Sequence, residues 1–533
     1  MTDGPSSSAW SPLRHPIFRA LWLASVVSNI GTWMQNVGGV WLMSSLSPSP
    51  FLVALMQTAT SLPVFLVGLP AGALADIVDR RRLLLFTQGL MLMAAVILSV
   101  LTIANAIDAR SLLALTFILG LGTALNTPTW QAVMPDLVPR RDLAAAVALN
   151  GVTVNLGRAA GPALGGVVVA ASGPGVVFLL NALSFVGILI VLYRWPTTPT
   201  GGVSPAERVL GATRAGLRYV RHAPEVRTVL IRAGVFIAAG SAIWALLPVL
   251  ARHELGLGAA GFGLLLGCIG LGAIGGAAVL PRLRGKYPLD HALVGATVIF
   301  ALATGGLALL TNLVALGAVM VAGGVAWIVL MASFNTAAQN TAPTWVRARV
   351  LGAYLLVFQG GLALGSVLWG VLAARVGIRA ALIIAAAALI AGLAATLRWP
   401  MTSGASLDLR PSLHWPEPRI EIETAADEGP VLVTIEYRID PNTGNDFVAA
   451  MHALGRVRRR DGAVQWGIHR DIADPSRYLE TFLTESWVEH LRQHQRGTIS
   501  DRAIEDRARA FHIGETPPRA AHLIYARTKK ETA

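Results

Sequence analysis

The chain has 533 residues, of which 54% are hydrophobic and 14% are charged, and its mean hydropathy is +0.58. Soluble globular proteins carry about 25% charged residues, so this composition excludes an ordinary soluble protein and predicts an integral membrane protein. The net charge of +13 would suggest nucleic-acid binding in a soluble chain. Here the arginines flank apolar segments, as expected for basic residues at a membrane surface, so we expect no nucleic-acid partner.

Apolar runs long enough to cross a bilayer, about 20 residues each, recur twelve times before residue 400. They are residues 20–46, 51–75, 83–106, 112–133, 143–171, 176–193, 228–250, 261–280, 292–310, 314–334, 350–373 and 380–397. No signal-peptide cleavage pattern follows the first run, so we expect a retained first helix. The sequence therefore predicts an all-α polytopic protein with two six-helix halves, 1–194 and 228–400, joined by a central loop, 195–227.

Lysines and arginines favour one side of this predicted bundle. If the N-terminus is cytoplasmic, the inner ends hold most of them, including Arg80, Arg81, Arg82 and the central loop. Basic residues concentrate on the cytoplasmic side of membrane proteins, so we expect both termini to be cytoplasmic.

The central loop contains an amphipathic pattern. One helical face carries Ala206, Val209, Leu210, Leu217 and Val220, interrupted only by Thr213, and the arginines lie largely away from it. The pattern predicts a helix lying on the inner membrane surface.

The fifth and eleventh apolar runs share one spacing of small residues. Gly157, Gly161-Pro162 and Gly165-Gly166 in the fifth correspond to Gly361, Gly365-Ser366 and Trp369-Gly370 in the eleventh. Two repeated halves are typical of transporters whose site lies between them. Glycines four residues apart allow close helix packing in lipid, so we interpret these glycines as packing residues and expect Pro162 to bend its helix.

Two motifs carry a family resemblance. "GALADIVDRRR", residues 72–82, resembles the signature of the major facilitator superfamily, and "GRAAGPALGG", residues 157–166, resembles its fifth-helix motif, which is associated with exporters. Together with the first helix and the C-terminal tail, the whole chain resembles the bacterial enterobactin-exporter-like members with a soluble extension, called transmembrane secretion effectors. The resemblance implies a secondary active exporter in the bacterial inner membrane.

The first motif has a physical interpretation. Gly72 would allow close backbone approach, and the Asp76 carboxylate would face the N-terminus of a neighbouring helix, an interaction of about 0.3–1 kcal/mol. The resemblance implies that this neighbour is the eleventh helix and that Gly72, Asp76 and Arg80 act in gating or coupling. The alternative is that the arginines only set the topology.

Polar residues on the predicted helices suggest a substrate pathway, because polar groups are costly against lipid and should face the bundle interior. The candidates are Asn29, Trp33, Gln35 and Asn36 on the first helix, Thr123, Asn126, Thr127, Trp130 and Gln131 on the fourth, and Asn335, Gln339 and Gln359. Each could instead form a hydrogen bond between helices.

Arg158 lies near the middle of the fifth run, roughly 22 Å along it. A central arginine costs about 2.5–3.5 kcal/mol on insertion scales, and no carboxylate lies deep in any run; Asp76, Asp136 and Asp142 are at the ends. Arg158 either ties helix carbonyls and amides together or lines a cavity and attracts an anionic or catecholate-like group, which suits its planar fork. Proton antiport is implied by the resemblance alone.

After Pro400 the composition becomes that of a soluble protein. We expect a linker, 401–429, and a small cytoplasmic α+β domain, 430–533, of ferredoxin-like fold, with strands near 431–440, 463–472, 477–487 and 520–528 and helices near 446–462 and 488–511. His469, Asp471, Glu480, Trp487, His490 and His494 suggest a haem, monooxygenase or metal site. They form no firm ligand set, so we expect no cofactor, metal or catalysis, and a regulatory or homodimerising module.

The combined prediction is an exporter of a small amphiphilic molecule, siderophore-, antibiotic- or drug-like, working by alternating access with proton coupling. The alternatives are a transporter fused to a monooxygenase-like domain and a membrane sensor without flux.

Overall fold

The computed structural model describes residues 8, 10–195, 209–401, 407–412, 414–415 and 428–526; the side chains at 69, 73, 75–77 and 209–213 lie outside this description. The chain forms two compact units. The helical unit comprises Met1–Gly202, Arg232–Phe334 and Leu355–Pro400. The tail unit comprises Val203–Ile231, Asn335–Tyr354 and Met401–Ala533. The tail unit thus includes more than the predicted C-terminal domain, because part of the central loop and the segment before residue 355 belong to it.

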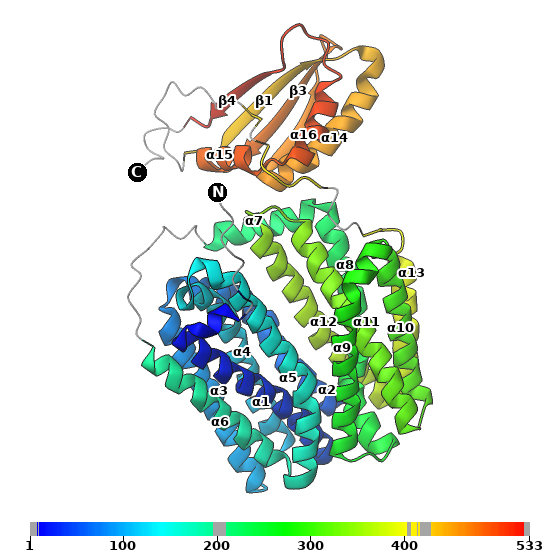
Figure 1. Cartoon of the computed structure of the whole chain (residues 1–533). Coiled ribbons are helices and arrows are strands. Elements are labelled where there is room, and N and C mark those ends of the chain that lie inside the picture. Colours follow the sequence, from blue (N-terminus) through cyan, green and yellow to red (C-terminus); the bar gives the residue numbers. More distant parts are fainter. Residues whose placement is uncertain are drawn as a thin grey trace. The chain divides into compact units, whose positions relative to one another are not determined.

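The first half of the chain forms long helices separated by short turns (Figure 1). They are α1 (Pro16–Leu46), α2 (Pro50–Ile77), α3 (Arg80–Ile103), α4 (Ala109–Leu137), α5 (Leu143–Ser172) and α6 (Pro174–Arg194), with 3-10 turns at Ser11–Arg14 and Arg140–Asp142. Proline begins α1, α2 and α6, where its missing N–H has no helical partner to lose.

The second half repeats this arrangement. Its helices are α8 (Pro224–Val249, continued by a π-helical turn, Leu250–Glu254), α9 (Ala259–Lys286), α10 (Leu289–Leu309), α11 (Leu313–Asn340), α12 (Arg347–Val376) and α13 (Ile378–Thr396). Gly377, with φ +88°, turns the chain between α12 and α13 as Gly173, with φ +81°, does between α5 and α6. Both turns need the left-handed backbone that glycine adopts without steric cost.

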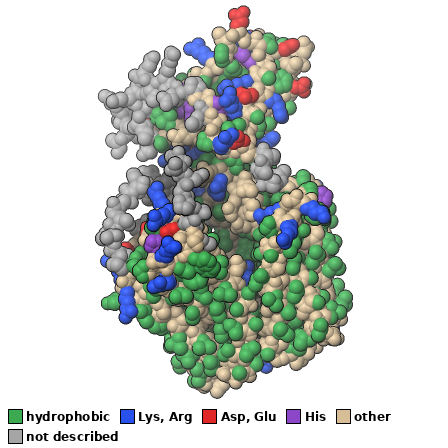
Figure 2. Space-filling view, viewed as in Figure 1, with side chains coloured by type: hydrophobic (Ala, Val, Ile, Leu, Met, Phe, Trp, Pro, Cys, Tyr) green, Lys and Arg blue, Asp and Glu red, His purple; other side chains and the backbone are tan. Residues whose placement is uncertain are grey.

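Eleven helices of the described residues are long and apolar enough to cross a membrane, so this is a multi-pass membrane protein. α1 is not among the eleven, although it has 31 residues. Asn29, Gln35 and Asn36 lower its hydropathy, and the predicted twelfth span remains a prediction. Hydrophobic side chains cover much of the visible surface of the helical unit (Figure 2), as expected for helices that face lipid.

Glycines allow the fifth helix of each half to approach the first. A Cβ on Gly161 would lie 2.4 Å from the Trp33 Cβ, and one on Gly165 would lie 2.8 Å from the Met34 Cα, while Gly157 contacts Asn29 in the same way. In the second half, Gly361 and Gly365 of α12 face Ile237 and Ala238 of α8. The repeated spacing in the sequence therefore corresponds to a repeated helix contact.

The two halves meet through two helix pairs of the helical unit. A Cβ on Gly166 of α5 would lie 2.8 Å from the Gly263 Cα of α9, and a Cβ on Gly370 of α12 would lie 2.6 Å from the Ala54 Cβ of α2. These contacts use the C-terminal parts of α5 and α12 and the N-terminal parts of α2 and α9. All four parts lie on the side of the bundle that the predicted topology places outside the cell.

The C-terminal residues form a four-stranded antiparallel sheet in the order β2-β3-β1-β4. Its strands are β1 (Val431–Arg438), β2 (Gln465–Arg470), β3 (Arg477–Thr484) and β4 (Arg519–Ile524). α14 (Gly444–Asp461) packs against it through a core that includes Phe447, Met451 and Leu454. The α+β class and the positions of all four strands agree with the sequence prediction.

The predicted helix over 488–511 is wrong as a single element, because the chain forms α15 (Trp487–Arg496) and α16 (Ile499–Arg509). Gly497 ends the first and Thr498 begins the second. The Thr498 side chain accepts a hydrogen bond from the Asp501 N–H, and the Asp501 side chain accepts one in return from the Thr498 N–H. This capping box satisfies N–H groups that one continuous helix would have bonded internally.

Two further segments of the tail unit add to the predictions. α7 (Val209–His222) is helical as expected, and it packs against α14 with Ala215 and Tyr219 buried. Leu217, on the expected apolar face, is 70% exposed, and the position of this face on the membrane stays a prediction. Part of the predicted linker is fixed to the tail domain, because the backbone of residues 408–412 forms hydrogen bonds with that of residues 497–500. This part of the linker therefore belongs to the fold of the tail.

Candidate substrate cavity in the helical unit

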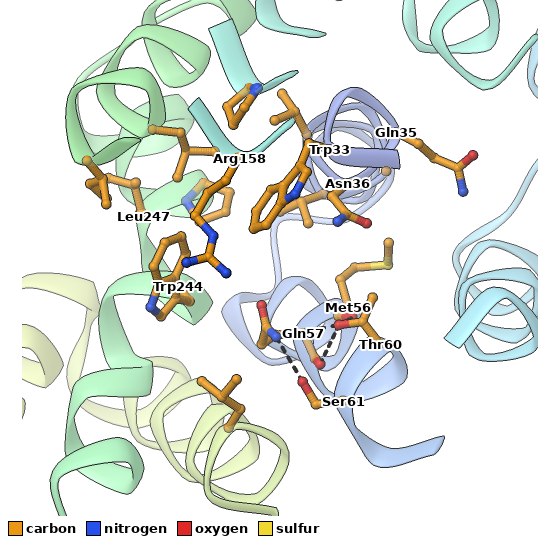
Figure 3. A pocket seen from close by; sticks show the side chains of 18 of the residues that line it. Trp33, Gln35, Asn36, Met56, Gln57, Thr60, Ser61, Arg158, Trp244 and Leu247 are labelled. Carbon is orange, nitrogen blue, oxygen red and sulfur yellow. Dashed lines mark hydrogen bonds between the residues drawn. The ribbon is translucent and has the colours of Figure 1, made fainter. Parts of the chain in front are cut away.

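A cavity of about 490 Å³ lies in the helical unit and is lined by both halves of the chain (Figure 3). α1, α2 and α5 contribute polar groups, and α8, α11 and α12 contribute mainly aromatic ones. Small-molecule sites are typically clefts of about 300–1,000 Å³ with apolar walls and a few polar groups. The cavity therefore has the size and composition of a site for a small organic molecule.

Arg158 is the one charged side chain among the residues that line this cavity. Its guanidinium carbon lies 5.7 Å from the centre of the Trp33 ring, in the geometry of a cation–π contact. No ion pair of Arg158 occurs within the described residues, and Figure 3 shows the side chain pointing into the cavity. The positive charge is therefore directed at whatever occupies the cavity.

Aromatic rings form the wall contributed by the second half. Trp244 of α8 and Trp327 of α11 lie 5.4 Å apart, centre to centre, and Trp327 lies 6.4 Å from Phe358 of α12. Nε1 of Trp244 is buried and has no hydrogen-bond partner in the part of the chain that is described. The wall combines apolar area with an N–H donor.

A small polar patch on α2 completes the lining. Nε2 of Gln57 donates to Oγ of Ser61 at 2.9 Å, and Thr60 lies between them in sequence. Asn36 of α1 and Gln359 of α12 also line the cavity. These groups could form hydrogen bonds with an oxygen-rich solute.

Six of the predicted pathway residues line the cavity: Trp33, Gln35, Asn36, Thr123, Arg158 and Gln359. Pro162, which was expected to bend the fifth helix, also lines the cavity. It lies inside α5, which continues on both sides of this residue. Gln35 contributes to the lining, but its Oε1 accepts a hydrogen bond from Asn181 at 2.6 Å, and the side chain points away from Arg158.

The other predicted pathway residues lie elsewhere. Asn126 accepts hydrogen bonds from Thr87 and Gln88 of α3, which is the bond between helices that was the alternative interpretation. Asn29 donates to the carbonyl of Ser25 within its own helix. Gln131 is exposed and is not part of the lining. Asn335 and Gln339 bond to each other in the tail unit.

Sequence reasoning missed the α2 patch and the aromatic wall. The i, i+4 spacing of Gln57 and Ser61 within an apolar run was a usable signal. Trp244, Trp327 and Phe358 carried none, because an aromatic residue in an apolar run is equally suited to lipid, to the core or to a cavity.

The structure describes the side chain of only one of the two charged residues predicted to act in gating, Arg80. Arg80 donates to Asp136 of α4 at 3.0 Å and to the Ala132 carbonyl, so its partner here is in the same half. A Cβ on Gly72 would meet no described atom within 4 Å, and the expected close backbone approach stays a prediction. The Asp76 side chain lies outside the described residues.

The tail residues noted in the sequence do not form one site. Glu480 is buried and accepts hydrogen bonds from Arg458, Trp466 and Tyr437. Asp471 pairs with Arg477, and His469 contacts Thr481, both at more exposed positions.

His490 and His494 lie together beside Trp487 and His522. Burial is the largest influence on both imidazoles and lowers the pKa of His490 to about 3 and the pKa of His494 to about 4. Both rings are therefore neutral near pH 7.

A family model described as "transmembrane secretion effector" matches residues 7–530, which is nearly the whole chain, tail included. The chain belongs to the transmembrane secretion effector family. This is the resemblance that the motifs and the tail indicated, and it makes the protein a major facilitator superfamily member whose relatives are transporters rather than enzymes.

Two curated relatives of this secretion effector are siderophore transporters by name. The enterobactin exporter EntS of Salmonella typhimurium is 29% identical over 374 residues, covering 68% of this chain and 86% of that protein. The staphyloferrin A transporter of Staphylococcus aureus is 27% identical over 263 residues, covering 48% of this chain and 65% of that protein.

Solved structures share the fold of the helical part. An inward-facing bacterial homologue of the human lysosomal transporter Spinster aligns with a TM-score of 0.58 at 16% identity, covering 73% of this chain and 97% of that one. An inward-facing bacterial homologue of the iron transporter ferroportin gives a TM-score of 0.58 at 14% identity, covering 72% and 98%.

Proposed function

We propose that this protein is a secondary active exporter of a small anionic amphiphile of the siderophore, antibiotic or drug class. The observation that carries the proposal is Arg158, the one cation among the described residues that line a largely apolar cavity between both halves. Planar guanidinium groups bind carboxylate and catecholate oxygens in bidentate geometry, and aromatic walls bury the apolar part of such molecules. The named substrates of the two siderophore transporters among the relatives are the first compounds to test.

Alternating access is our proposal for the transport cycle, with twelve spans and both termini in the cytoplasm. The contacts of α5 with α9 and of α2 with α12 use the ends that this topology places outside, whereas Gly72 at the inner end of α2 meets no described atom. This pattern supports an inward-open state. Asp76 would then engage the neighbouring half when the inner ends close.

We propose proton coupling through groups at the helix ends rather than in the cavity. Within the described lining residues there is no carboxylate or histidine. Asp142, which is buried and lies 3.1 Å from His15, is the best placed candidate.

For the tail, we infer a ferredoxin-like fold and a regulatory role. The order β2-β3-β1-β4 with all neighbours antiparallel supports the fold. Contacts of α14 and α15 with α7 inside the tail unit support the role. Dimerisation through the tail remains an alternative that sedimentation of the full chain can test.

Transport by everted membrane vesicles tests the function directly. Vesicles containing the wild-type protein should accumulate enterobactin or staphyloferrin A, and accumulation should collapse when the proton gradient is dissipated. Asp76→Asn should slow accumulation at unchanged protein level, because it weakens the closed inner end. Gly89→Ala in α3 serves as the control, since a Cβ there would meet no described atom within 4 Å and no gating role is predicted for Gly89.

Absence of flux for every anionic amphiphile tested would contradict the exporter and leave the membrane sensor. Conversion of the compound by the full chain, with a product of changed mass, would favour the transporter–monooxygenase fusion. An Asp76→Asn rate equal to that of wild type would refute the gating role while leaving export intact.

A further inference from the structure

Three histidines of the tail unit face one another. His490 and His494 lie one turn apart on α15, and His522 lies on β4. One ring nitrogen from each of the three lies within 4.8 Å of the others, and the Nε2 atoms of His490 and His494 are 3.2 Å apart. Two ligands of a tetrahedral Zn²⁺ ion, each about 2.0–2.1 Å from the metal, are separated by about 3.3 Å.

The three rings are held in place by their surroundings. His490 is 1% exposed and packs against Trp487 and Phe482, Trp415 meets His494 edge-on at 4.7 Å, and the Trp487 ring lies 6.1 Å from His522. The site is therefore built on a helix and a strand rather than on a mobile loop, as metal ligands require for a defined geometry.

The cluster leaves polar atoms without partners. Nδ1 of His490 and Oε1 of Gln493 are both buried and lack a hydrogen-bond partner in the part of the chain that the structure describes. Burying polar groups without partners is costly, and three imidazoles side by side offer one another few donors. A cation bound to Nε2 of His490 would fix the proton on Nδ1, where Oε1 of Gln493 can accept it.

One buried positive charge acts on the cluster, because Arg458 disfavours positive charge on His490 and His494. Its guanidinium is paired with Glu480 at 3.1 Å and with Glu505 at 3.2 Å. Two buried carboxylates thus balance it.

We propose that His490, His494 and His522 bind a divalent transition-metal ion of the Zn²⁺ type, with a fourth position open to water or an external ligand. Imidazole nitrogens suit Zn²⁺, Cu²⁺, Ni²⁺ and Co²⁺. Gln493 lies one turn from His490 and would accept the Nδ1 proton when Nε2 coordinates, which is the usual arrangement around a metal-bound histidine. The sequence pointed away from a metal because the third ligand comes from a separate strand.

The histidine cluster is next to a contact between α15 and α7 within the tail unit. Glu489 precedes His490 on α15 and pairs with Arg218 of α7 at 2.7 Å. A metal that fixes α15 would also hold Glu489 in position for Arg218. Metal occupancy would then stabilise the contact between α15 and α7.

The test uses the purified full chain without a histidine tag, stripped with chelator and dialysed. Titration with Co²⁺ should give the visible absorption of four-coordinate cobalt at one ion per chain, and Zn²⁺ should bleach it. His494→Gln and His522→Gln should each weaken Co²⁺ binding at least tenfold. His469→Gln, a histidine of the same domain outside the cluster, should bind as wild type does.

Failure of the wild-type protein to develop this absorption, or binding of less than one tenth of an ion per chain, would overturn the proposal without recourse to any variant. Equal binding by wild type and His522→Gln would also overturn it, provided that circular dichroism shows both to be folded. As an independent readout, Zn²⁺ should raise the unfolding temperature of the wild type and leave that of His522→Gln unchanged.

Discussion

In the proposed function, the guanidinium of Arg158 favours anionic solutes in the cavity. Inserting this guanidinium into the membrane costs about 2.5–3.5 kcal/mol on translocon scales. The cation–π contact with the Trp33 ring offsets part of this cost, because such contacts typically contribute about 0.5–2 kcal/mol. The alternative, a guanidinium that ties carbonyls and amides together, finds no hydrogen bond to support it among the described residues. The guanidinium can therefore still form an ion pair with an anionic solute in the cavity.

Gly161 determines where the ring that faces Arg158 lies. A Cβ there would lie 2.4 Å from the Trp33 Cβ and 3.1 Å from the Ile30 carbonyl oxygen, so Gly161→Ala must displace α1. We expect a loss of about 1–3 kcal/mol of stability from overpacking, together with weaker substrate binding. Thermal unfolding in detergent measures the first effect.

Gly151, in the same helix, is the matched control because its Cβ would meet no described atom within 4 Å. Gly151→Ala should keep or raise the unfolding temperature, since alanine is the better helix former. An unfolding temperature for Gly161→Ala equal to that of Gly151→Ala would contradict the close-packing account.

The sequence could predict cavity residues where a charged or polar side chain would be costly in contact with lipid. Arg158 and Asn36 were predictable because a charge or amide in an apolar run must face the interior. Asn126 followed the same logic and does not line the cavity, since a polar side chain can meet that requirement with a hydrogen bond to a neighbouring helix. Only the three-dimensional packing separates these two outcomes.

Among the elements, helices and strands were predictable where periodicity was strong. The apolar runs became α1–α6 and α8–α13, and the alternating tail segments became β1–β4. The break between α15 and α16 was missed because the helical pattern continues through Gly497, and the capping box at Thr498 was not taken into account. The contact of α7 with α14, through Ala215 and Tyr219, could not be predicted because it joins segments far apart in the sequence.

The buried pair of Arg458 with Glu505 makes the stability of the tail depend on pH. Burial disfavours the Glu505 carboxylate, but Arg458, His414 and Arg509 hold its pKa well below the ordinary value near 4.3. Its stabilising contribution is therefore complete above about pH 4.3 and is lost as the pH falls below it, by at most about 1.4 kcal/mol per pH unit. Calorimetry of the full chain at acid pH measures this slope.

Glu505→Gln should flatten that slope and lower the stability of the tail, because breaking a buried ion pair costs up to about 3–5 kcal/mol. Asp506→Asn is the control, since Asp506 is exposed and pairs only loosely with Arg502 at 3.5 Å. A slope that is the same in all three proteins would show that Glu505 does not link tail stability to pH.

For the whole molecule, the fold and family followed from composition, run length and two motifs, but the division into units did not. The segments Val203–Ile231 and Asn335–Tyr354 join the C-terminal residues in the tail unit. Long-range pairs such as Arg218 with Glu489 create this arrangement, and no local pattern encodes them. The cavity likewise depends on side chains from helices far apart in sequence.

The most direct test of the account compares an anionic amphiphile with its neutral methyl ester in proteoliposomes. Wild type should prefer the anion. Arg158→Gln should raise the apparent dissociation constant of the anion roughly ten- to hundredfold. This factor corresponds to the loss of about 1.5–3 kcal/mol, which is typical of hydrogen bonds to a charged group. The apparent dissociation constant of the ester should stay unchanged.

Arg158→Lys should keep the charge and lose only the bidentate geometry, giving an intermediate value. Arg252→Ala, which removes an arginine held over Trp41 at 4.9 Å outside the cavity lining, should transport both compounds as wild type does. Arg158→Gln with an unaltered ratio of anion to ester transport, at wild-type expression, would contradict the claim that Arg158 recognises the charge of the substrate.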